Sequence, residues 1–372
     1  MYNQEISMKT ALIYNQEIKK YSFGKGHPFT SDRFENFLAF LKQKLPDFNN
    51  FFELIVPKPA KDKDLELFHS KEYIEAMKKA SKGIILPNIF QYTTTDNLDP
   101  STGYLPKGID KAGKIAVGSS LKAAELVFKG KFKKAISLGG GLHHAKKQKG
   151  EGFCIYNDVV ISAKALLKKG IKRVLILDTD AHAGNGTAEA FYNENEVLFI
   201  DMHQDPRTVY PGTGFIHEIG EGKGKGFTIN ISLPPGASDK SYEYAFDKII
   251  FPVVKEFKPE IIIRNGGSDP HFADGLTNLG LTLNGFKMIG EKVRKLANEV
   301  CGGKEIDLIA SGYNQKILPS AWLSLISGLC NLSIEIKEDK KVFPKKDFRL
   351  KETKNVIENL KSHLKNHWKC FR

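Results

Sequence analysis

The sequence has little cysteine and no long hydrophobic run. Its four cysteines, Cys154, Cys301, Cys330 and Cys370, are far apart and form no CxxC pair, so neither a disulfide framework nor a structural zinc knot is expected. No apolar run reaches the roughly 18 residues that a membrane span needs, and the N-terminus lacks an apolar signal region after a basic start. These absences argue against a membrane protein and a disulfide-rich secreted domain, and they favour the reducing cytoplasm.

The content of apolar and charged residues is that of a globular protein. Of the 372 residues, 41% are hydrophobic and 27% are charged, so the chain can bury a sizeable core and is not disordered throughout. Lys and Arg number 56 against 43 Asp and Glu, a formal net charge of +13. This balance suits acidic partners, but a lysine-rich solvated surface explains it more simply. We therefore predict no direct nucleic-acid binding, and the oligomeric state stays open.

Short apolar runs alternate with segments of helical periodicity over most of the chain. We predict strands at Ala135–Leu138, Arg173–Leu177, Glu196–Met202, Phe227–Leu233, Glu260–Arg264 and Asp307–Ala310. We predict helices at Gly108–Gly130, Asp158–Lys169, Ser241–Phe257, Leu283–Val300 and Leu350–Trp368. Near-continuous apolar strands between helices indicate a mostly parallel central sheet covered on both faces, which is a three-layer α/β/α domain.

No linker rich in Pro and Ser divides the chain, so a single domain is expected. We assign residues 1–8 to an N-terminal extension and residues 9–335 to the domain. Residues 336–372 include a charged run, usually a solvated connection, and end in a basic helix that we expect to pack on the domain.

Polar residues gather just after the predicted strands, at the edge where parallel sheets bind ligands. Asp178, Asp180 and His182 follow the strand Arg173–Leu177, and residues i and i+2 of an extended segment point to the same side. A carboxylate beside an imidazole suits a divalent transition metal. Capping of the next helix is the alternative, but two Asp and one His within five residues favour a metal.

Three further clusters follow other predicted strands, and each has a simpler explanation. The adjacent His143 and His144, after three glycines, could share a reactive site or be hydrogen-bonded structural residues. Asp269, in Asn-Gly-Gly-Ser-Asp, could be a third metal ligand or part of a turn. Tyr313, in Ser-Gly-Tyr-Asn, could donate to a developing oxyanion, although most tyrosines do no such work.

Together these clusters resemble one family. The segments GGGLHHAKKQKGEGFCIYND, LDTDAHAGNGT, MHQDPRTVYPGTG, NGGSD and SGYN, with GHPFTSDR and LPPGASDKSYEYAF, occur in this chain. Their order and spacing resemble those of the zinc-dependent histone deacetylase superfamily, which includes acetylpolyamine amidohydrolases and acetoin-utilisation proteins. The resemblance covers roughly residues 9–332, a span that one α/β domain can occupy, and it implies an arginase-deacetylase-like fold.

The resemblance implies a catalytic centre with one Zn²⁺ per chain. The implied zinc ligands are Asp180, His182 and Asp269. The paired histidines His143 and His144 match general acid/base residues, and which of the two is the base stays open. The other implied residues are Asp178 and Asn185, which contact the first and second histidine, and Tyr313, which polarises the substrate carbonyl.

The resemblance also implies a tunnel for an acylated lysine. Its predicted parts are the walls Phe153 and Tyr210, the carbonyl of Gly152, the rim residue Leu276, the acidic residue Asp99 and the inner-cavity arginine Arg33. A monovalent cation, K⁺ or Na⁺, could bind near Asp178 and Asp201. Asp201 stands where many relatives carry Ser, and Ser311 stands where many carry Gly, which predicts a stiffer loop there.

The activity that these features favour is hydrolysis of the acetamide of N-ε-acetyl-lysine in proteins. A small acetylated amine is the other substrate class, with an acetylpolyamine amidohydrolase as the alternative enzyme, but a chain of charge +13 repels polyamine cations at long range. A catalytically weak acyl-lysine binding module is a further alternative, which the intact set of reactive residues disfavours. A two-metal arginase-type site would need carboxylates at Gly184 and His271, which the chain lacks.

Overall fold

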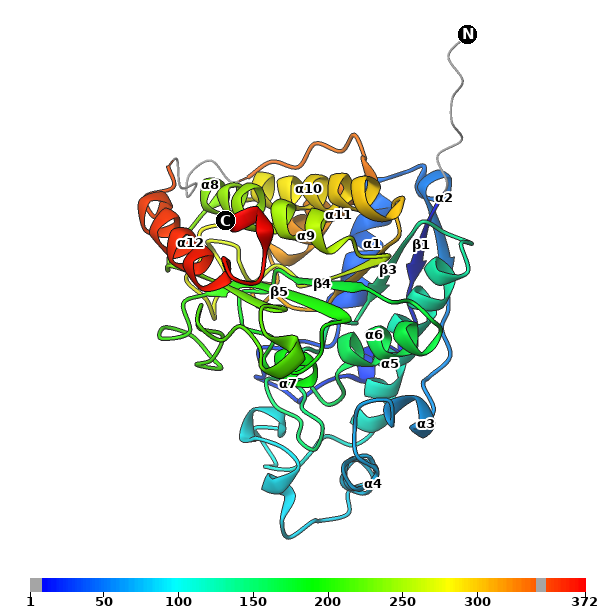
Figure 1. The fold of residues 1–372 in the computed structure, drawn as a ribbon. Coiled ribbons are helices and arrows are strands. Elements are labelled where there is room, and N and C mark those ends of the chain that lie inside the picture. The colour runs from blue at the N-terminus through cyan, green and yellow to red at the C-terminus, as the bar shows by residue number, and fades with distance from the viewer. Residues whose placement is uncertain (1–8, 339–345) are drawn as a thin grey trace.

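Eight parallel strands form the sheet at the centre of the molecule (Figure 1). The computed structural model describes residues 9–338 and 346–372. The strands are β1 (Thr10–Ile13), β2 (Phe52–Ile55), β3 (Lys134–Leu138), β4 (Val174–Asp178), β5 (Val197–Gln204), β6 (Thr228–Leu233), β7 (Ile261–Asn265) and β8 (Glu305–Ile309). Their order across the sheet is β2-β1-β3-β8-β7-β4-β5-β6. The predicted α/β/α fold is confirmed.

Burial explains why these segments are strands. Every residue of β4, β5, β6, β7 and β8 is buried, so apolar side chains face helices on both sides, as a parallel sheet requires. The six predicted strands lie within a few residues of their observed bounds. Strands β1 and β2 were not predicted, because each is only four residues long and lies in the irregular N-terminal third.

Helices cover both faces of the sheet (Figure 1). One layer contains α5 (Ile109–Phe128), α6 (Asp158–Lys168) and α7 (Asn185–Phe191). The other contains α1 (Arg33–Lys44), α8 (Asp239–Ala245), α9 (Phe251–Phe257), α10 (Leu283–Cys301) and α11 (Leu318–Cys330). Shorter helices are α2 (Phe48–Phe51), α3 (Asp62–Leu65) and α4 (Lys71–Ala80). The predicted helix Ser241–Phe257 is α8 and α9 joined by a π-helical turn at Phe246–Ile250. Within the described ranges, no helix is both long and apolar enough to cross a membrane.

The C-terminal helix α12 (Leu350–Leu364) lies against α8 and β6. Its buried face includes Ile357, Leu360 and Leu364. The Thr353 hydroxyl donates to the Ser241 hydroxyl at 2.8 Å, and the Trp368 indole N–H donates to the Gly226 carbonyl at 2.8 Å. The predicted extension at residues 1–8 and residues 339–345 of the predicted connection lie outside the described residues.

A buried ion pair joins β7 and β8 beneath the carboxyl ends of the strands. Arg264 and Asp307 are both fully buried, and the Arg264 Nε donates to Asp307 Oδ1 at 2.5 Å. Arg264 Nη1 also donates to the Thr179 hydroxyl at 3.1 Å, in the segment that carries Asp178 and Asp180. The pair therefore ties the sheet to the loop that follows β4.

Removing one partner of this pair is expected to destabilise the fold. Arg264→Met leaves the Asp307 carboxylate buried without its cation, which should lower the free energy of unfolding by about 3–5 kcal/mol. Denaturant titration of the purified variant measures this change. The double variant R264M/D307L removes both charges and should recover most of the loss, whereas equal instability of the single and double variants would contradict the argument.

Candidate active site

The four reactive motifs follow four neighbouring strands. His143 and His144 come after β3, Tyr313 after β8, Asp269 after β7, and Asp180 with His182 after β4. Because all of these strands run parallel, their carboxyl ends meet at one edge of the sheet, where ligands of such sheets bind. The topology thus brings residues up to 170 positions apart into one place.

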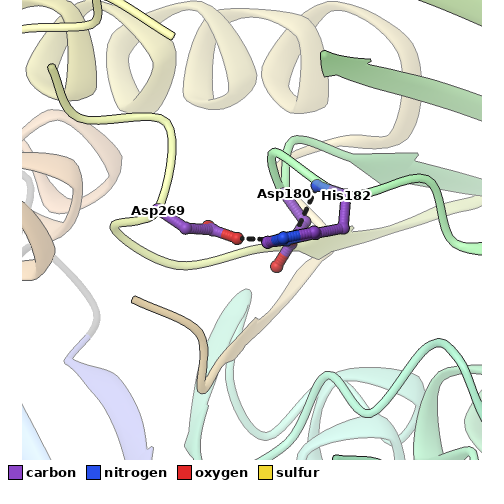
Figure 2. Close-up of side chains that lie close together, drawn as sticks. All are labelled: Asp180, His182 and Asp269. Carbon is purple, nitrogen blue, oxygen red and sulfur yellow. Dashed lines mark hydrogen bonds and ion pairs between the residues drawn. The ribbon is translucent and has the colours of Figure 1, made fainter. Parts of the chain in front are cut away.

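Asp180, His182 and Asp269 form a compact, buried group (Figure 2). One potential ligand atom from each residue lies within 4.8 Å of the other two. The His182 Nδ1 is 3.1 Å from Asp180 Oδ1 and 2.9 Å from Asp269 Oδ2. In Figure 2 the imidazole of His182 points its edge toward the Asp269 carboxylate. Two carboxylate oxygens and one imidazole nitrogen are a ligand set that suits Zn²⁺ and related divalent ions.

The electrostatics of this group fit a bound cation. Burial, followed by the neighbouring Asp180 carboxylate, raises the pKa of Asp269. Two carboxylates that face each other away from water cannot both ionise cheaply unless a positive charge lies between them. A divalent ion would supply that charge and leave open positions for substrate, as in catalytic zinc sites with three protein ligands.

Within the described ranges this is the only group of three such residues placed to hold a metal. His271, two residues after Asp269, instead faces Glu338, with the His271 Nε2 3.2 Å from Glu338 Oε1. Gly184 supplies no side chain. The arrangement therefore offers one metal position and not the pair that an arginase-type site needs.

Ser311 and Gly267 hold Asp269 close to the tyrosine loop. The Ser311 hydroxyl donates to Asp269 Oδ1 at 2.9 Å, and the Ser268 N–H donates to the Ser311 carbonyl at 3.0 Å. A Cβ on Gly267 would lie 2.1 Å from the Ser311 carbonyl oxygen, so only glycine permits this approach. The serine that departs from the family pattern thus fixes one oxygen of Asp269 and leaves the other facing His182.

The paired histidines lie beside the metal group and contact each other. Their Nε2 atoms are 3.1 Å apart. The His143 Nδ1 lies 2.8 Å from Asp178 Oδ2, and the His144 Nδ1 lies 2.8 Å from Asn185 Oδ1. Each histidine therefore has the partner that the resemblance implied, a carboxylate for the first and an amide for the second.

The two partners give the histidines opposite charge preferences. Burial lowers the pKa of His143, but the Asp178 and Asp180 carboxylates outweigh it and raise this pKa to about 9. Burial and the neighbouring His143 lower the pKa of His144 well below its ordinary value. The pair therefore favours a protonated His143 next to a neutral His144, and a neutral imidazole is the one that can accept a proton.

Aromatic side chains surround the approach to the histidines. The Tyr210 ring is 5.1 Å from the His144 ring, and the Phe153 ring is 5.8 Å from the Tyr313 ring. Gly152 packs so tightly that a Cβ there would lie 2.3 Å from the His144 ring. A cavity of about 20 Å³ is lined by the two histidines, Phe153, Tyr313 and Ala310.

Of the predicted substrate-binding residues, Asp99 lies elsewhere than expected. Asp99 accepts hydrogen bonds from Ser101 and lies against Gly24, whereas Asp96 reaches the tunnel wall and accepts from the Gly152 N–H at 2.5 Å. Asp96, three positions earlier, is the acidic residue that lies at Gly152. Leu276 is 42% exposed on the loop of Asp274, whose carboxylate accepts from the Tyr313 N–H at 2.7 Å.

Arg33 lies behind the inner cavity instead of lining it. Its guanidinium carbon is 3.8 Å from the centroid of the Phe29 ring, and Phe29 separates it from the cavity. The Arg33 Nη1 donates to the carbonyls of Ala310 and Gly312, each at 2.9 Å. Its observed contacts hold the loop that carries Tyr313.

Asp201 is occupied by protein partners. Its Oδ1 lies 2.8 Å from the His203 Nδ1, and its Oδ2 accepts from the Gly184 N–H at 2.8 Å. Burial raises the pKa of Asp201. The His203 ring therefore contacts the Asp201 carboxylate, which is one of the two carboxylates near the predicted monovalent-cation position.

Sequence reasoning missed the residues that hold the loops in place. The Tyr21 hydroxyl donates to the Phe153 carbonyl at 2.8 Å and accepts from the Ile155 N–H at 2.9 Å. Asn157 donates to the carbonyls of His143 and Ala145, and Asp158 accepts from the N–H groups of Gly141 and Leu142. Asn157 and Asp158 stood in the quoted GFCIYND segment, where a polar pair before a helix was the available signal; nothing marked Tyr21.

Removal of one predicted ligand is expected to abolish metal binding. Asp269→Ala deletes an oxygen that faces His182, so the variant should no longer retain stoichiometric zinc after dialysis, measured by elemental analysis. Asp274→Asn, five residues along the same loop, is the matched control and should keep its metal. Full zinc retention by D269A would show that another residue is the third ligand.

Comparisons with known proteins show the family of this chain. The histone deacetylase domain model matches residues 27–329. A protein of Archaeoglobus fulgidus named as a probable deacetylase is 35% identical, with 98% of this chain and 100% of that protein covered. The acetoin utilization protein AcuC of Staphylococcus aureus strain COL is 37% identical over 89% of this chain and 84% of its own length. The crystal structure of the HDA15 HD domain matches with a TM-score of 0.82 at 24% identity, covering 98% of this chain and 97% of that one, and it supports the fold. The chain belongs to the histone deacetylase family.

Proposed function

We propose that this protein is a zinc-dependent deacetylase that hydrolyses the acetamide of N-ε-acetyl-lysine in proteins and releases acetate. The observation that carries the proposal is one buried site that joins three kinds of group. These are a ligand set for one divalent ion, a histidine pair with opposite charge preferences, and a tyrosine that lines the same cavity. Such a combination serves hydrolysis better than passive binding of an acyl-lysine.

A zinc ion held by Asp180, His182 and Asp269 would lower the pKa of a water molecule and polarise the acetamide carbonyl. His144, neutral and with its Nδ1 on Asn185, accepts a proton at its Nε2 as the water attacks. His143, which Asp178 keeps protonated, stabilises the negative charge that develops and supplies a proton to the leaving amine.

Tyr313 and the aromatic walls complete the proposed reaction path. The Tyr313 ring is 6.1 Å from the His182 ring, so its hydroxyl can donate to the oxyanion that forms on the acetyl carbonyl. Phe153 and Tyr210 would flank the lysine methylenes and exclude water. Gly152 and Asp96, joined at 2.5 Å, would orient the substrate backbone at the entrance.

The net charge supports the choice of substrate. A chain with a formal charge of +13 repels free polyamine cations at long range and exerts no such repulsion on neutral or acidic protein surfaces. The four unpaired cysteines are in keeping with the cytoplasmic location that we propose.

Tyr313→Phe tests the proposed oxyanion donor. Loss of one such hydroxyl should lower the turnover number by about 10²–10³-fold, while the zinc content stays at the level of the unmodified protein because no ligand is changed. Acetate release and elemental analysis measure the two quantities. Turnover within twofold of the unmodified protein would remove Tyr313 from the mechanism.

Acetate release from two substrates tests the proposed substrate class. Zinc-loaded protein is incubated in parallel with an acetyl-lysine peptide and with acetylputrescine, and faster release from the peptide is expected. Preference for acetylputrescine would make the protein an acetylpolyamine amidohydrolase. Inactivity on both substrates with zinc bound would contradict the proposed reaction.

A further inference from the structure

Glu151 lies buried behind the second histidine, and the mechanism above does not use it. The residue is only 8% exposed. Its Oε1 accepts a hydrogen bond from the Asn185 Nδ2 at 2.5 Å and lies 3.5 Å from the Lys146 Nζ. Asn185 in turn faces His144. The three side chains His144, Asn185 and Glu151 therefore form a hydrogen-bonded series that leads away from the reactive edge of His144.

The hydrogen bonds of this series allow only one orientation of the Asn185 amide. An ionised carboxylate accepts and does not donate, so the NH₂ end of the Asn185 amide must face Glu151. The carbonyl end must then face His144, where Asn185 Oδ1 lies 2.8 Å from the His144 Nδ1. Because a carbonyl oxygen only accepts, this Nδ1 must carry the proton.

The protonated Nδ1 decides what the other nitrogen of His144 can do. A neutral imidazole has one proton, so the Nε2 is left with its lone pair. The Nε2 faces the His143 Nε2 at 3.1 Å, at the reactive side of the pair. In this tautomer His144 can accept a proton, and in the opposite tautomer it cannot.

Asparagine alone would not enforce this tautomer. The two ends of an amide are nearly equal in shape, and rotation by half a turn would present the NH₂ end to the Nδ1. The imidazole proton would then move to the Nε2, and the general base would be lost. An aspartate at position 185 would present an acceptor in either orientation, so it would not need a second residue behind it.

We propose that Glu151 is a positioning residue for the general base: it fixes the Asn185 amide and thereby keeps the Nε2 of His144 free to accept a proton. This inference rests on the proposed deacetylase function for its kinetic consequence. Its structural part, the tautomer of His144, does not depend on any substrate. The Lys146 Nζ, 3.5 Å from Glu151 Oε1, places a positive charge beside this carboxyl group.

The variant Glu151→Met removes the acceptor at nearly the same side-chain length. Outer hydrogen-bond partners of this kind are worth about 10–100-fold, so we expect the kcat on an acetyl-lysine peptide to fall by that factor with little change in KM. Glu189→Met is the matched control, because Glu189 also pairs with Lys146, at 3.8 Å, but its side chain is 57% exposed and has no bond to Asn185. The control should keep the kcat of the unmodified protein.

Replacing Asn185 distinguishes positioning from mere structural support. In E151M, the added change Asn185→Asp supplies an acceptor without help and should restore most of the lost kcat. In the presence of Glu151 the same change brings two carboxylates together and should lower kcat. Melting temperatures of all variants are measured first. If E151M fails to fold, the kcat of N185D alone still tests the contact between position 185 and Glu151.

The tautomer itself can be read by nitrogen NMR on histidine-labelled protein, with His144→Gln to assign the signal. The unmodified protein and E189M should carry the His144 proton on Nδ1, and E151M should lose this preference. An unchanged tautomer in E151M, or a double variant no better than E151M, would overturn the inference. Absence of deacetylation by the unmodified protein would contradict the proposed function and leave the tautomer measurement to decide the role of Glu151.

Discussion

Buried negative charge at the carboxyl ends of two neighbouring strands is the constraint on which the site depends. Asp178, Asp180 and Asp269 come from β4 and β7 and the loops after them, and all are buried. Carboxylates so placed need positive charge or hydrogen-bond donors to stay ionised. His143 contacts Asp178, and Ser311 donates a hydrogen bond to Asp269. A divalent ion would balance the remaining negative charge. The same few side chains therefore serve both the proposed reaction and the stability of the fold.

The same constraint explains the form of the loops. Asp178 accepts from the Asn265 Nδ2 at 2.8 Å and from the Asp180 N–H at 3.1 Å, besides contacting His143. Such bonds need the backbone to come close, and glycine at positions 141 and 267 leaves room that a Cβ would fill. The glycine-rich motifs are thus a consequence of packing donors around buried carboxylates.

The sequence predicted the parts of this arrangement that are local in the chain. The six strands from β3 to β8 could be read from their continuous apolar character, and the spacing of Asp180 and His182 placed both on one side of a strand end. Contacts between distant segments could not be read in this way. Nothing near Asp99 or Asp96 indicates which one reaches Gly152, because that choice depends on the path of the loop between α4 and α5.

Arg33 and Ser311 are two further residues whose long-range contacts could not be predicted from the sequence. The motif around Arg33 implied a cavity wall, but the packing of Phe29 sets the guanidinium behind that wall. Ser311 stood out as a departure from the family pattern, and only the fold shows that its hydroxyl meets Asp269. The partners of Tyr21 lie more than 130 positions away, so its neighbours in the sequence carry no sign of its contact.

The contacts of Arg33 have a consequence for how the protein matures. Arg33 bonds to Ala310 and Gly312, which are 277 and 279 positions away, so the loop of Tyr313 cannot take its final place until nearly the whole chain has been synthesised. Ser311 of the same loop holds Asp269. During biosynthesis the tyrosine and the last of the three potential metal ligands are therefore fixed together, after α1 has met the segment that follows β8.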